Sequence, residues 1–167
     1  MEAKSRPRTW PYTCGLKDAE GGPHLVRRAR LAPEEVEQFV RRVEEELGSA
    51  GGARVGAPVA VIGHGGGGAG LGGPEVPADT VGVEVRVPIA RGTPPPDGFE
   101  SVEYESVPVA YTVHHGPVGG LAAAEEILTG WVRLKALKAV AEVRRVYLKR
   151  GKNPRKHVTE VQVPLER

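Results

Sequence analysis

Residues 83–89 read Val-Glu-Val-Arg-Val-Pro-Ile, and residues 159–165 repeat this pattern as Thr-Glu-Val-Gln-Val-Pro-Leu. In both segments apolar residues alternate with polar ones, which is the period of a β-strand with one buried face. Each segment has a glutamate opposite its valine face, and each ends at a proline, which cannot donate a hydrogen bond to a neighbouring strand. Because the pattern recurs at a constant offset, we predict that the chain contains two copies of one structural unit.

The first copy is predicted to be a β-α-β-β unit over residues 24–90. His24–Leu31 alternates as a strand, and Pro33–Leu47 has the pattern of an amphipathic helix, with proline and glutamates at its start and a glycine after its end. Apolar residues recur at helical spacing along this segment: Val36, Phe39, Val40, Val43 and Leu47. Residues 58–62 and 80–88 are the two remaining predicted strands.

The second copy is predicted over residues 99–167, after a stiff proline-rich linker at residues 91–98. Its predicted elements come in the same order: a strand at 102–115, a helix at 121–137, and strands at 143–148 and 158–165. One such unit leaves part of its sheet and of its helix uncovered, so the two copies are expected to pack side by side. The predicted fold class is α+β with an antiparallel sheet.

Composition limits the class of protein. The chain has 167 residues and a formal net charge of +2, which is the size of one domain and gives only weak overall attraction to nucleic acid. Its 23 glycines and 15 prolines predict long irregular connections. No apolar run is long enough to span a membrane and no signal peptide is recognisable, so we expect a cytoplasmic protein. The single cysteine excludes an internal disulfide, and we expect neither a cofactor nor a metal.

Two segments are predicted to be irregular. Residues 1–23 are interrupted by proline and glycine and are expected to form a flexible arm, whose Trp10 is a candidate cover for a cavity in the body. The glycine-rich loop over residues 65–73 belongs to a run with a formal Gly-x-Gly-x-x-Gly motif. The Leu-Gly-Gly-Pro segment in that run cannot begin the helix that a dinucleotide site requires, so we interpret the loop as a second candidate cover.

Several segments of the second half occur in an order and spacing typical of a known family. They are Val107–Pro117 (VPVAYTVHHGP), Trp131 in the predicted helix, Arg144–Tyr147 (RRVY) and Thr159–Pro164 (TEVQVP). With them the chain resembles the GyrI-like small-molecule-binding family, the domain type of the effector-binding domain of multidrug-responsive transcription activators. The resemblance implies duplicated β-α-β-β repeats of the SHS2 type with pseudo-two-fold symmetry, two helices on one face of the sheet, and a ligand cleft on the other.

The function implied by this resemblance is that of a stand-alone protein that binds a bulky aromatic or drug-like ligand, in sensing or sequestering xenobiotics. Two alternatives stay open: hydrolysis of a reactive small molecule by cleft carboxylates, and modulation of gyrase or another protein partner. The basic segment 133–156 is the candidate surface for such a partner. The short segment before the first predicted strand has no room for a helix-turn-helix, so we expect no direct DNA binding, and no membrane partner.

Strand parity predicts which side chains face the implied cleft. In the last strand the valines should lie beneath the helices, which leaves Glu160 and Gln162 on the cleft side. In the preceding strand Val146 and Leu148 suit the helix side, which puts Arg145 and Tyr147 in the cleft. The predicted ligand-binding residues are Glu84, Tyr111, Trp131, Arg145, Tyr147 and Glu160, of which Glu84 and Glu160 are the catalytic candidates if the protein is a hydrolase.

Some of these assignments have structural alternatives. Tyr111 and Trp131 could form flat walls for an aromatic ligand or belong to the ordinary core. Members of the family commonly have a glutamate at the position of Arg145, where it can neutralise a cationic ligand. Arg145 could instead pair with Glu160, bind an anionic ligand, or point to solvent.

Overall fold

The computed structural model describes residues 12–49, 54–63 and 79–167. Trp10 and the glycine-rich loop over residues 65–73, the two candidate covers, lie outside the described residues. The described strands are β1 (Cys14–Ala19), β2 (Gly22–Leu31), β3 (Val59–Gly63), β4 (Val81–Pro88), β5 (Glu100–Tyr104), β6 (Val107–His115), β7 (Arg144–Lys149) and β8 (Val158–Pro164). The described α-helices are α1 (Val36–Ser49) and α2 (Leu121–Leu134), and short 3-10 helices cover Pro33–Glu35, Val118–Gly120 and Pro154–Lys156.

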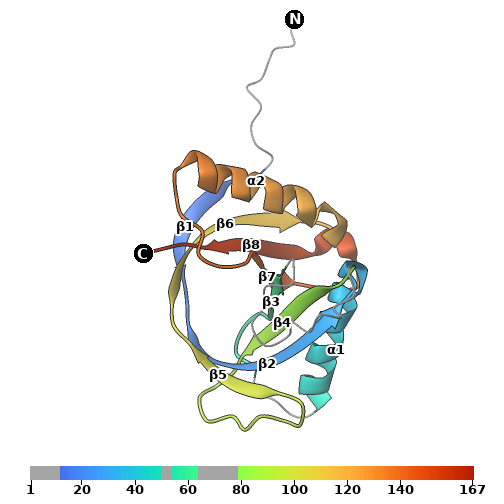
Figure 1. Ribbon diagram of the computed structural model, residues 1–167. Coiled ribbons are helices and arrows are strands. Elements are labelled where there is room, and N and C mark those ends of the chain that lie inside the picture. Colours follow the sequence, from blue (N-terminus) through green and yellow to red (C-terminus); the bar gives the residue numbers. More distant parts are fainter. Residues whose placement is uncertain (1–11, 50–53, 64–78) are drawn as a thin grey trace, which may run out of the picture.

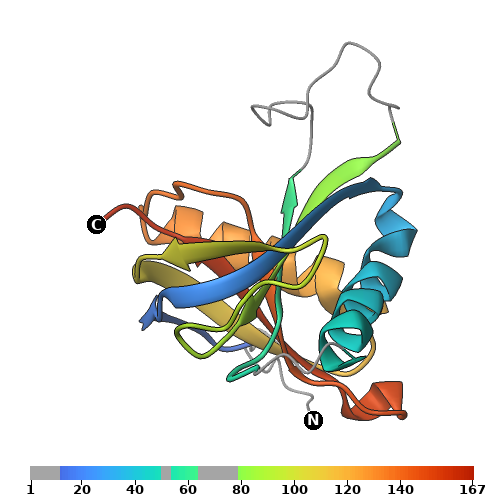
Figure 2. The ribbon, with the colours of Figure 1, turned by 90° about the horizontal axis from the view of Figure 1, so that it is seen from below.

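One antiparallel sheet contains all eight described strands, in the order β1-β6-β8-β7-β3-β4-β2-β5. The sheet is strongly curled, and both helices lie on its outer side (Figures 1 and 2). The prediction of an α+β protein with an antiparallel sheet and two helices on one face is therefore confirmed.

The apolar stripes of the two helices explain where they pack. The five residues predicted at helical spacing in α1 are all buried against the valines of β4, and α2 is buried against β6 and β8. In the α2 cluster the buried residues of β8 and the chain end are Val161, Val163 and Leu165. The predicted position of the β8 valines beneath a helix is confirmed, and the opposite face of β8 points to the inner side of the sheet.

The N-terminal segment contains a strand that sequence analysis missed. Cys14–Ala19, which we predicted to be part of a flexible arm, forms edge strand β1 and pairs with β6 along its whole length. The hydroxyl of Thr112 on β6 donates to the carbonyl of Thr13 at 2.9 Å. The sequence of β1 has no clear apolar alternation, so the strand was not recognised. As an edge strand it is held mainly by main-chain hydrogen bonds to β6, a partner far away in the sequence.

The segment predicted as one strand over residues 102–115 is two strands that belong to opposite ends of the sheet. β5 pairs with β2, whereas β6 pairs with β8 and β1. The chain turns between them at Glu105 and Ser106, and the Ser106 hydroxyl oxygen accepts a hydrogen bond from the Gly21 backbone N–H at 3.1 Å. The turn before β2 and the turn after β5 are therefore in contact.

Neither of the two described α-helices has the length and the apolar character that crossing a membrane would require.

Candidate ligand-binding cleft

The inner face of the curled sheet carries the side chains that surround the candidate site. Residues directly opposite each other in neighbouring antiparallel strands point to the same face, so the pairing can be followed across the sheet. One row of paired residues contains Glu84, Val61, Arg144, Gln162 and Tyr111. The next row contains Arg86, Val59, Val146 and Glu160. Both rows point away from the helices, because the residues that alternate with them pack beneath α1 and α2.

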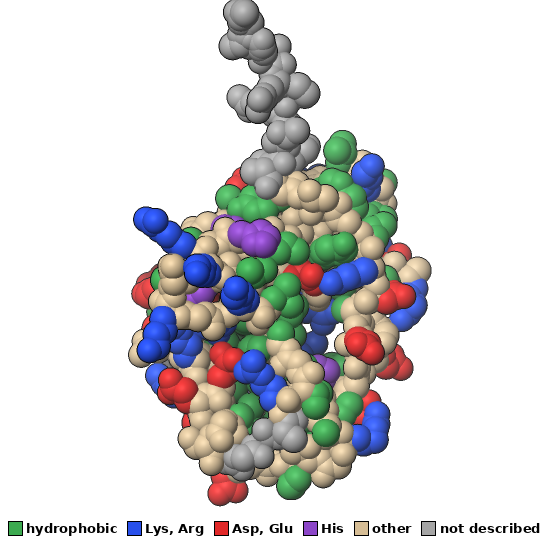
Figure 3. Space-filling view, turned by 180° about the vertical axis from the view of Figure 1, so that it is seen from behind, with side chains coloured by type: hydrophobic (Ala, Val, Ile, Leu, Met, Phe, Trp, Pro, Cys, Tyr) green, Lys and Arg blue, Asp and Glu red, His purple; other side chains and the backbone are tan. Residues whose placement is uncertain are grey.

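A cleft of about 710 Å³ opens on this inner face, a volume suited to a small molecule. Its apolar lining includes Ala57, Val59, Pro88, Val107, Val146 and Leu148. Its polar lining includes Lys17, His24, Arg86, Tyr104, Arg144, Glu160 and Gln162. Seen from behind, the molecule is hollowed near its centre, where hydrophobic side chains are exposed between charged ones (Figure 3).

The predicted faces of β7 are wrong. Arg145 lies opposite Val161, which packs beneath α2, so Arg145 and Tyr147 point toward the helices and not into the cleft. Val146 and Leu148, predicted to lie beneath the helices, line the cleft instead. The prediction assigned faces from apolar character, whereas the face of a strand is set by its register with its neighbour.

On the helix side, Arg145 and Tyr147 belong to a polar network that joins both helices to β7. Arg145 Nε lies 2.8 Å from Glu125 of α2, and its Nη1 lies 3.2 Å from Glu37 of α1. The Tyr147 hydroxyl donates to the same Glu37 at 2.7 Å. Burial alone would lower the pKa of Arg145, but the two carboxylates raise it above its ordinary value. Arg145 therefore forms ion pairs, as one of the alternatives proposed, but it pairs with Glu37 and Glu125 and not with Glu160.

The two aromatic candidates lie on different sides of the sheet. Trp131 is partly buried against the α2 core cluster, and Lys135 Nζ lies 5.9 Å from its ring centroid, so the prediction that Trp131 lies at the cleft is wrong. Tyr111 faces the inner side beside the cleft, opposite Gln162, with Lys17 Nζ 4.5 Å from its ring centroid.

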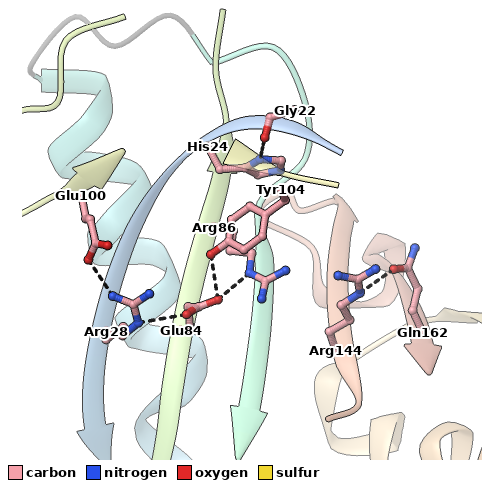
Figure 4. Close-up of polar contacts among 9 residues, drawn as sticks. All are labelled: Gly22, His24, Arg28, Glu84, Arg86, Glu100, Tyr104, Arg144 and Gln162. Atoms are coloured by element: carbon pink, nitrogen blue, oxygen red, sulfur yellow. Dashed lines mark hydrogen bonds and ion pairs between the residues drawn. The ribbon is translucent and has the colours of Figure 1, made fainter. Parts of the chain in front are cut away.

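Glu84 lies on the inner face, where three donors hold its carboxylate. Arg28 Nε lies 2.9 Å from Oε1, and Arg86 Nε and the Tyr104 hydroxyl lie 2.5 Å and 3.1 Å from Oε2 (Figure 4). Burial would raise the pKa of Glu84, but Arg86 and Arg28 outweigh it and hold the pKa below its ordinary value. Burial, together with the Glu84 charge, raises the pKa of Tyr104 to about 12, so this phenol keeps its proton. Glu84 therefore positions Arg86 and Tyr104.

Glu160 is held in a similar way in the second half. Gln162, two residues further along β8, donates to Oε2 at 2.6 Å, and Lys17 Nζ lies 2.8 Å from Oε1. Glu160 is only 5% exposed, so this ion pair is shielded from water on one side. Among the predicted site residues, it is Glu160 that lines the cleft directly.

Two arginines on neighbouring rows supply positive charge to the cleft. Arg86 from β4 and Arg144 from β7 lie on either side of β3 (Figure 4). Arg86 stacks on the Tyr104 ring at 3.9 Å from its centroid, and Arg144 donates through Nε to the neutral Gln162 Oε1 at 3.0 Å. Burial and repulsion from Arg86 lower the pKa of Arg144 to about 10. Within the described part of the chain no carboxylate forms an ion pair with Arg144.

His24 completes the polar side of the cleft. It is 8% exposed, its Nδ1 lies 2.8 Å from the carbonyl oxygen of Gly22, and its ring packs edge-on against Tyr104. Burial lowers the pKa of His24 below its ordinary value, and the nearby charges of Arg86 and Arg144 act in the same direction. The imidazole is therefore neutral at pH 7, with Nδ1–H donating to Gly22 and Nε2 left as an acceptor.

No protein-family model matches this chain, and no curated protein sequence matches it either. Solved structures match most of its length. The EcmrR C-terminal domain aligns with a TM-score of 0.77 at 15% identity, over 94% of this chain and 99% of that one. EcmrR in a complex with DNA aligns with a TM-score of 0.80 at 15% identity, covering 96% of this chain. SAV2435 bound to tetraphenylphosphonium aligns with a TM-score of 0.61 at 12% identity, over 92% of this chain and 94% of that one. The chain has the GyrI-like fold.

This chain spans 60% of the EcmrR chain in the DNA complex. At these identities the likeness establishes the architecture, and the chemistry of the cleft has to be taken from this chain's own residues. Within its GyrI-like fold the predicted site is divided between the two faces of the sheet. Glu84, Tyr111 and Glu160 lie on the inner face, whereas Trp131, Arg145 and Tyr147 lie on the helix side.

Sequence analysis missed most of the polar residues that line the cleft. Arg86 could have been found, because it lies two residues after Glu84 and must share its face, as Gln162 shares the face of Glu160. Lys17 and Tyr104 lie on strands whose pairing is not visible in the sequence. Arg144 was missed because the two faces of β7 were assigned the wrong way round.

Proposed function

We propose that this protein binds a bulky, largely apolar small molecule in the cleft on the inner face of its sheet. The observation that carries the proposal is the cleft itself, about 710 Å³ in volume, with apolar walls and a small number of fixed polar groups. Ligand sites in proteins commonly have this composition. Its floor lies on β3 and β7 at the centre of the sheet, so it is formed before a ligand arrives.

The proposed role is binding without turnover, as needed to sense or sequester a xenobiotic compound. A hydrolase would use Glu84 or Glu160 as an acid or base, and a general acid must hold a proton near neutral pH. The arginines at Glu84 keep it ionised, and Glu160 is occupied by Lys17 and Gln162. The structure of SAV2435 with tetraphenylphosphonium supports the idea that this architecture can accept a bulky organic compound.

We also infer that the two halves are copies of one β-α-β-β unit, each preceded by an extra strand. Exchanging β1 with β5, β2 with β6, β3 with β7 and β4 with β8 gives the same strand order read from the opposite edge of the sheet. The carboxylates of Glu84 and Glu160 are each bonded by the residue two positions later. The proposed cleft would therefore lie between pseudo-equivalent halves.

The proposed function can be tested with an uncharged aromatic ligand and with a variant whose cleft is filled by a larger side chain. 1-Pyrenebutanol should bind the protein, as measured by isothermal titration calorimetry. Val146→Trp should weaken this binding at least tenfold, because the new ring would occupy the cleft floor and not the core. The matched control is Leu134→Trp at a site 74% exposed on α2, which should leave the affinity unchanged. Absence of binding to the unmodified protein, or equal binding by both variants, would contradict the proposed site.

A further inference from the structure

We propose that the cleft selects ligands that carry an oxyanion, such as a carboxylate or sulfonate, on an apolar body, and that Arg144 and Arg86 hold the anionic group. This names the ligand class of the cleft and rests on the function proposed above. Arg86 and Arg144 lie on the two strands that flank β3, on the inner side of the sheet (Figure 4).

The guanidinium groups of Arg144 and Arg86 have donors to spare. Arg144 uses Nε to bond Gln162, and Arg86 uses Nε to bond Glu84. Among the described residues, no hydrogen bond or ion pair involves the terminal nitrogens of either arginine. A guanidinium presents its donors in a planar fork that matches the two oxygens of a carboxylate or sulfonate. Each arginine is oriented by its existing bond and keeps its outer donors for a ligand.

The positive charge of Arg144 is not neutralised by the acidic residues that line the cleft. Glu160 is already paired with Lys17. The other acidic lining residues are Asp18, Glu20 and Glu105, all of which are exposed, so water and salt screen their charge. Arg144 itself is half-buried, where a charge interacts more strongly. An anionic group placed beside Arg144 would offset the energetic cost of burying its charge and the repulsion from Arg86.

The apolar lining determines what the rest of the ligand must be. Val59 and Val146 lie side by side on the central strands, in the row next to Arg144, and Leu148 and Pro88 extend this surface. A ligand with its oxyanion at the arginines would place an apolar body over these side chains. A bulky lipophilic cation would meet the same apolar surface but would be repelled by Arg144, whose charge has no carboxylate partner among the described residues.

A matched series of probes tests this selectivity. We would measure the affinities of 1-pyrenebutyrate, 1-pyrenebutanol and (1-pyrenebutyl)trimethylammonium by calorimetry at one pH and salt concentration. The carboxylate should bind about tenfold or more tightly than the alcohol, since a charge-assisted bond to arginine is stronger than a neutral one. The ammonium compound should bind more weakly than the alcohol. Equal affinities for all three would overturn the inference and leave the proposed function standing, whereas binding of none would overturn both.

Variants assign the selectivity to Arg144. Arg144→Gln should reduce the preference for carboxylate over alcohol to less than about threefold, while its unchanged affinity for the alcohol would show that the cleft is intact. Arg144→Lys should keep part of the preference, because it keeps the charge but loses the planar fork. Arg91→Gln is the control for net charge, because Arg91 is 75% exposed and pairs with Glu103. A preference that persists in Arg144→Gln, or disappears equally in Arg91→Gln, would overturn the assignment.

Discussion

Tyr147 shows how one residue connects β7 to α1 on the side of the sheet opposite the cleft. It is 3% exposed, and its hydroxyl donates to Glu37 of α1, which also pairs with Arg145. Arg150 stacks on the Tyr147 ring at 4.6 Å from the centroid. The other oxygen of Glu37, Oε1, is buried without a hydrogen-bond partner among the described residues. The Glu37 carboxylate therefore depends on Tyr147 and Arg145.

Replacing Tyr147 with phenylalanine should lower the stability of the protein without changing its affinity for a ligand in the cleft. Removal of the hydroxyl leaves a buried acceptor less satisfied, so Tyr147→Phe should lower the free energy of unfolding by about 1–2 kcal/mol. The affinity for 1-pyrenebutanol should not change, because Tyr147 does not face the cleft. Urea denaturation and calorimetry would check the two effects. A variant of normal stability that no longer binds the probe would contradict the placement of Tyr147.

At the scale of elements, the connection between β1 and β2 and the turn between β5 and β6 come into close backbone contact at Gly21. A Cβ atom built on Gly21 would lie 2.2 Å from the carbonyl oxygen of Tyr104 and 2.5 Å from the carbonyl carbon of Glu105. These are main-chain atoms, which cannot move aside as the end of a flexible side chain can. Glycine is therefore required where the β1–β2 connection crosses the β5–β6 turn.

A pair of glycine variants measures this requirement. Gly21→Ala should destabilise the protein by about 2 kcal/mol or more, because the added methyl group forces the two turns apart. Gly48→Ala is the matched control, since Gly48 lies in α1 with no atom within 4 Å of an added Cβ. It should stabilise the protein by about 0.5–1 kcal/mol through helix propensity. Thermal and urea unfolding would compare them, and equal stability of the two variants would refute the close approach.

At the scale of the whole molecule, each half supplies an edge strand to the other half. β1 pairs with β6, and β5 pairs with β2, so both outer strands pair across the predicted boundary between the copies. At the centre the halves are joined by β3 and β7, where Val59, Ala60 and Val61 pair with Val146, Arg145 and Arg144. The sheet is consequently shared between the two predicted units.

Cutting the chain within the loop at residues 91–98 tests this sharing. A fragment of residues 1–96 would lose the partner of β1, one partner of β2 and one partner of β3. We expect that neither this fragment nor residues 97–167 folds alone, because unpaired strands leave backbone groups and apolar faces exposed. An equimolar mixture should regain the circular dichroism and cooperative melting of the intact protein. Cooperative melting of either fragment alone would show that the exchanged edge strands are dispensable.

Much of the architecture was predictable because its signals are local. The helical spacing from Val36 to Leu47 and the alternation from Val81 to Val87 each report burial of one face, and both elements are present. β1 was not predictable, because an edge strand made of Cys-Gly-Leu-Lys-Asp-Ala depends on its distant partner for stability. The break at Glu105 was missed because residues on both sides of it favour strands.

The composition of the cleft was only partly accessible from the pattern of residues. Alternation along a single strand is an intrinsic property, so Glu84 and Glu160 could be placed opposite the valines before any pairing was known. The faces of β7 were different, because its pattern is mixed and only the register with β8 and β3 turns Arg144 inward and Arg145 toward the helices. A shift of one residue exchanges the two faces of a strand, and long-range hydrogen bonds alone select between them. The positive charge that Arg144 brings to the cleft is for this reason a property of the folded sheet.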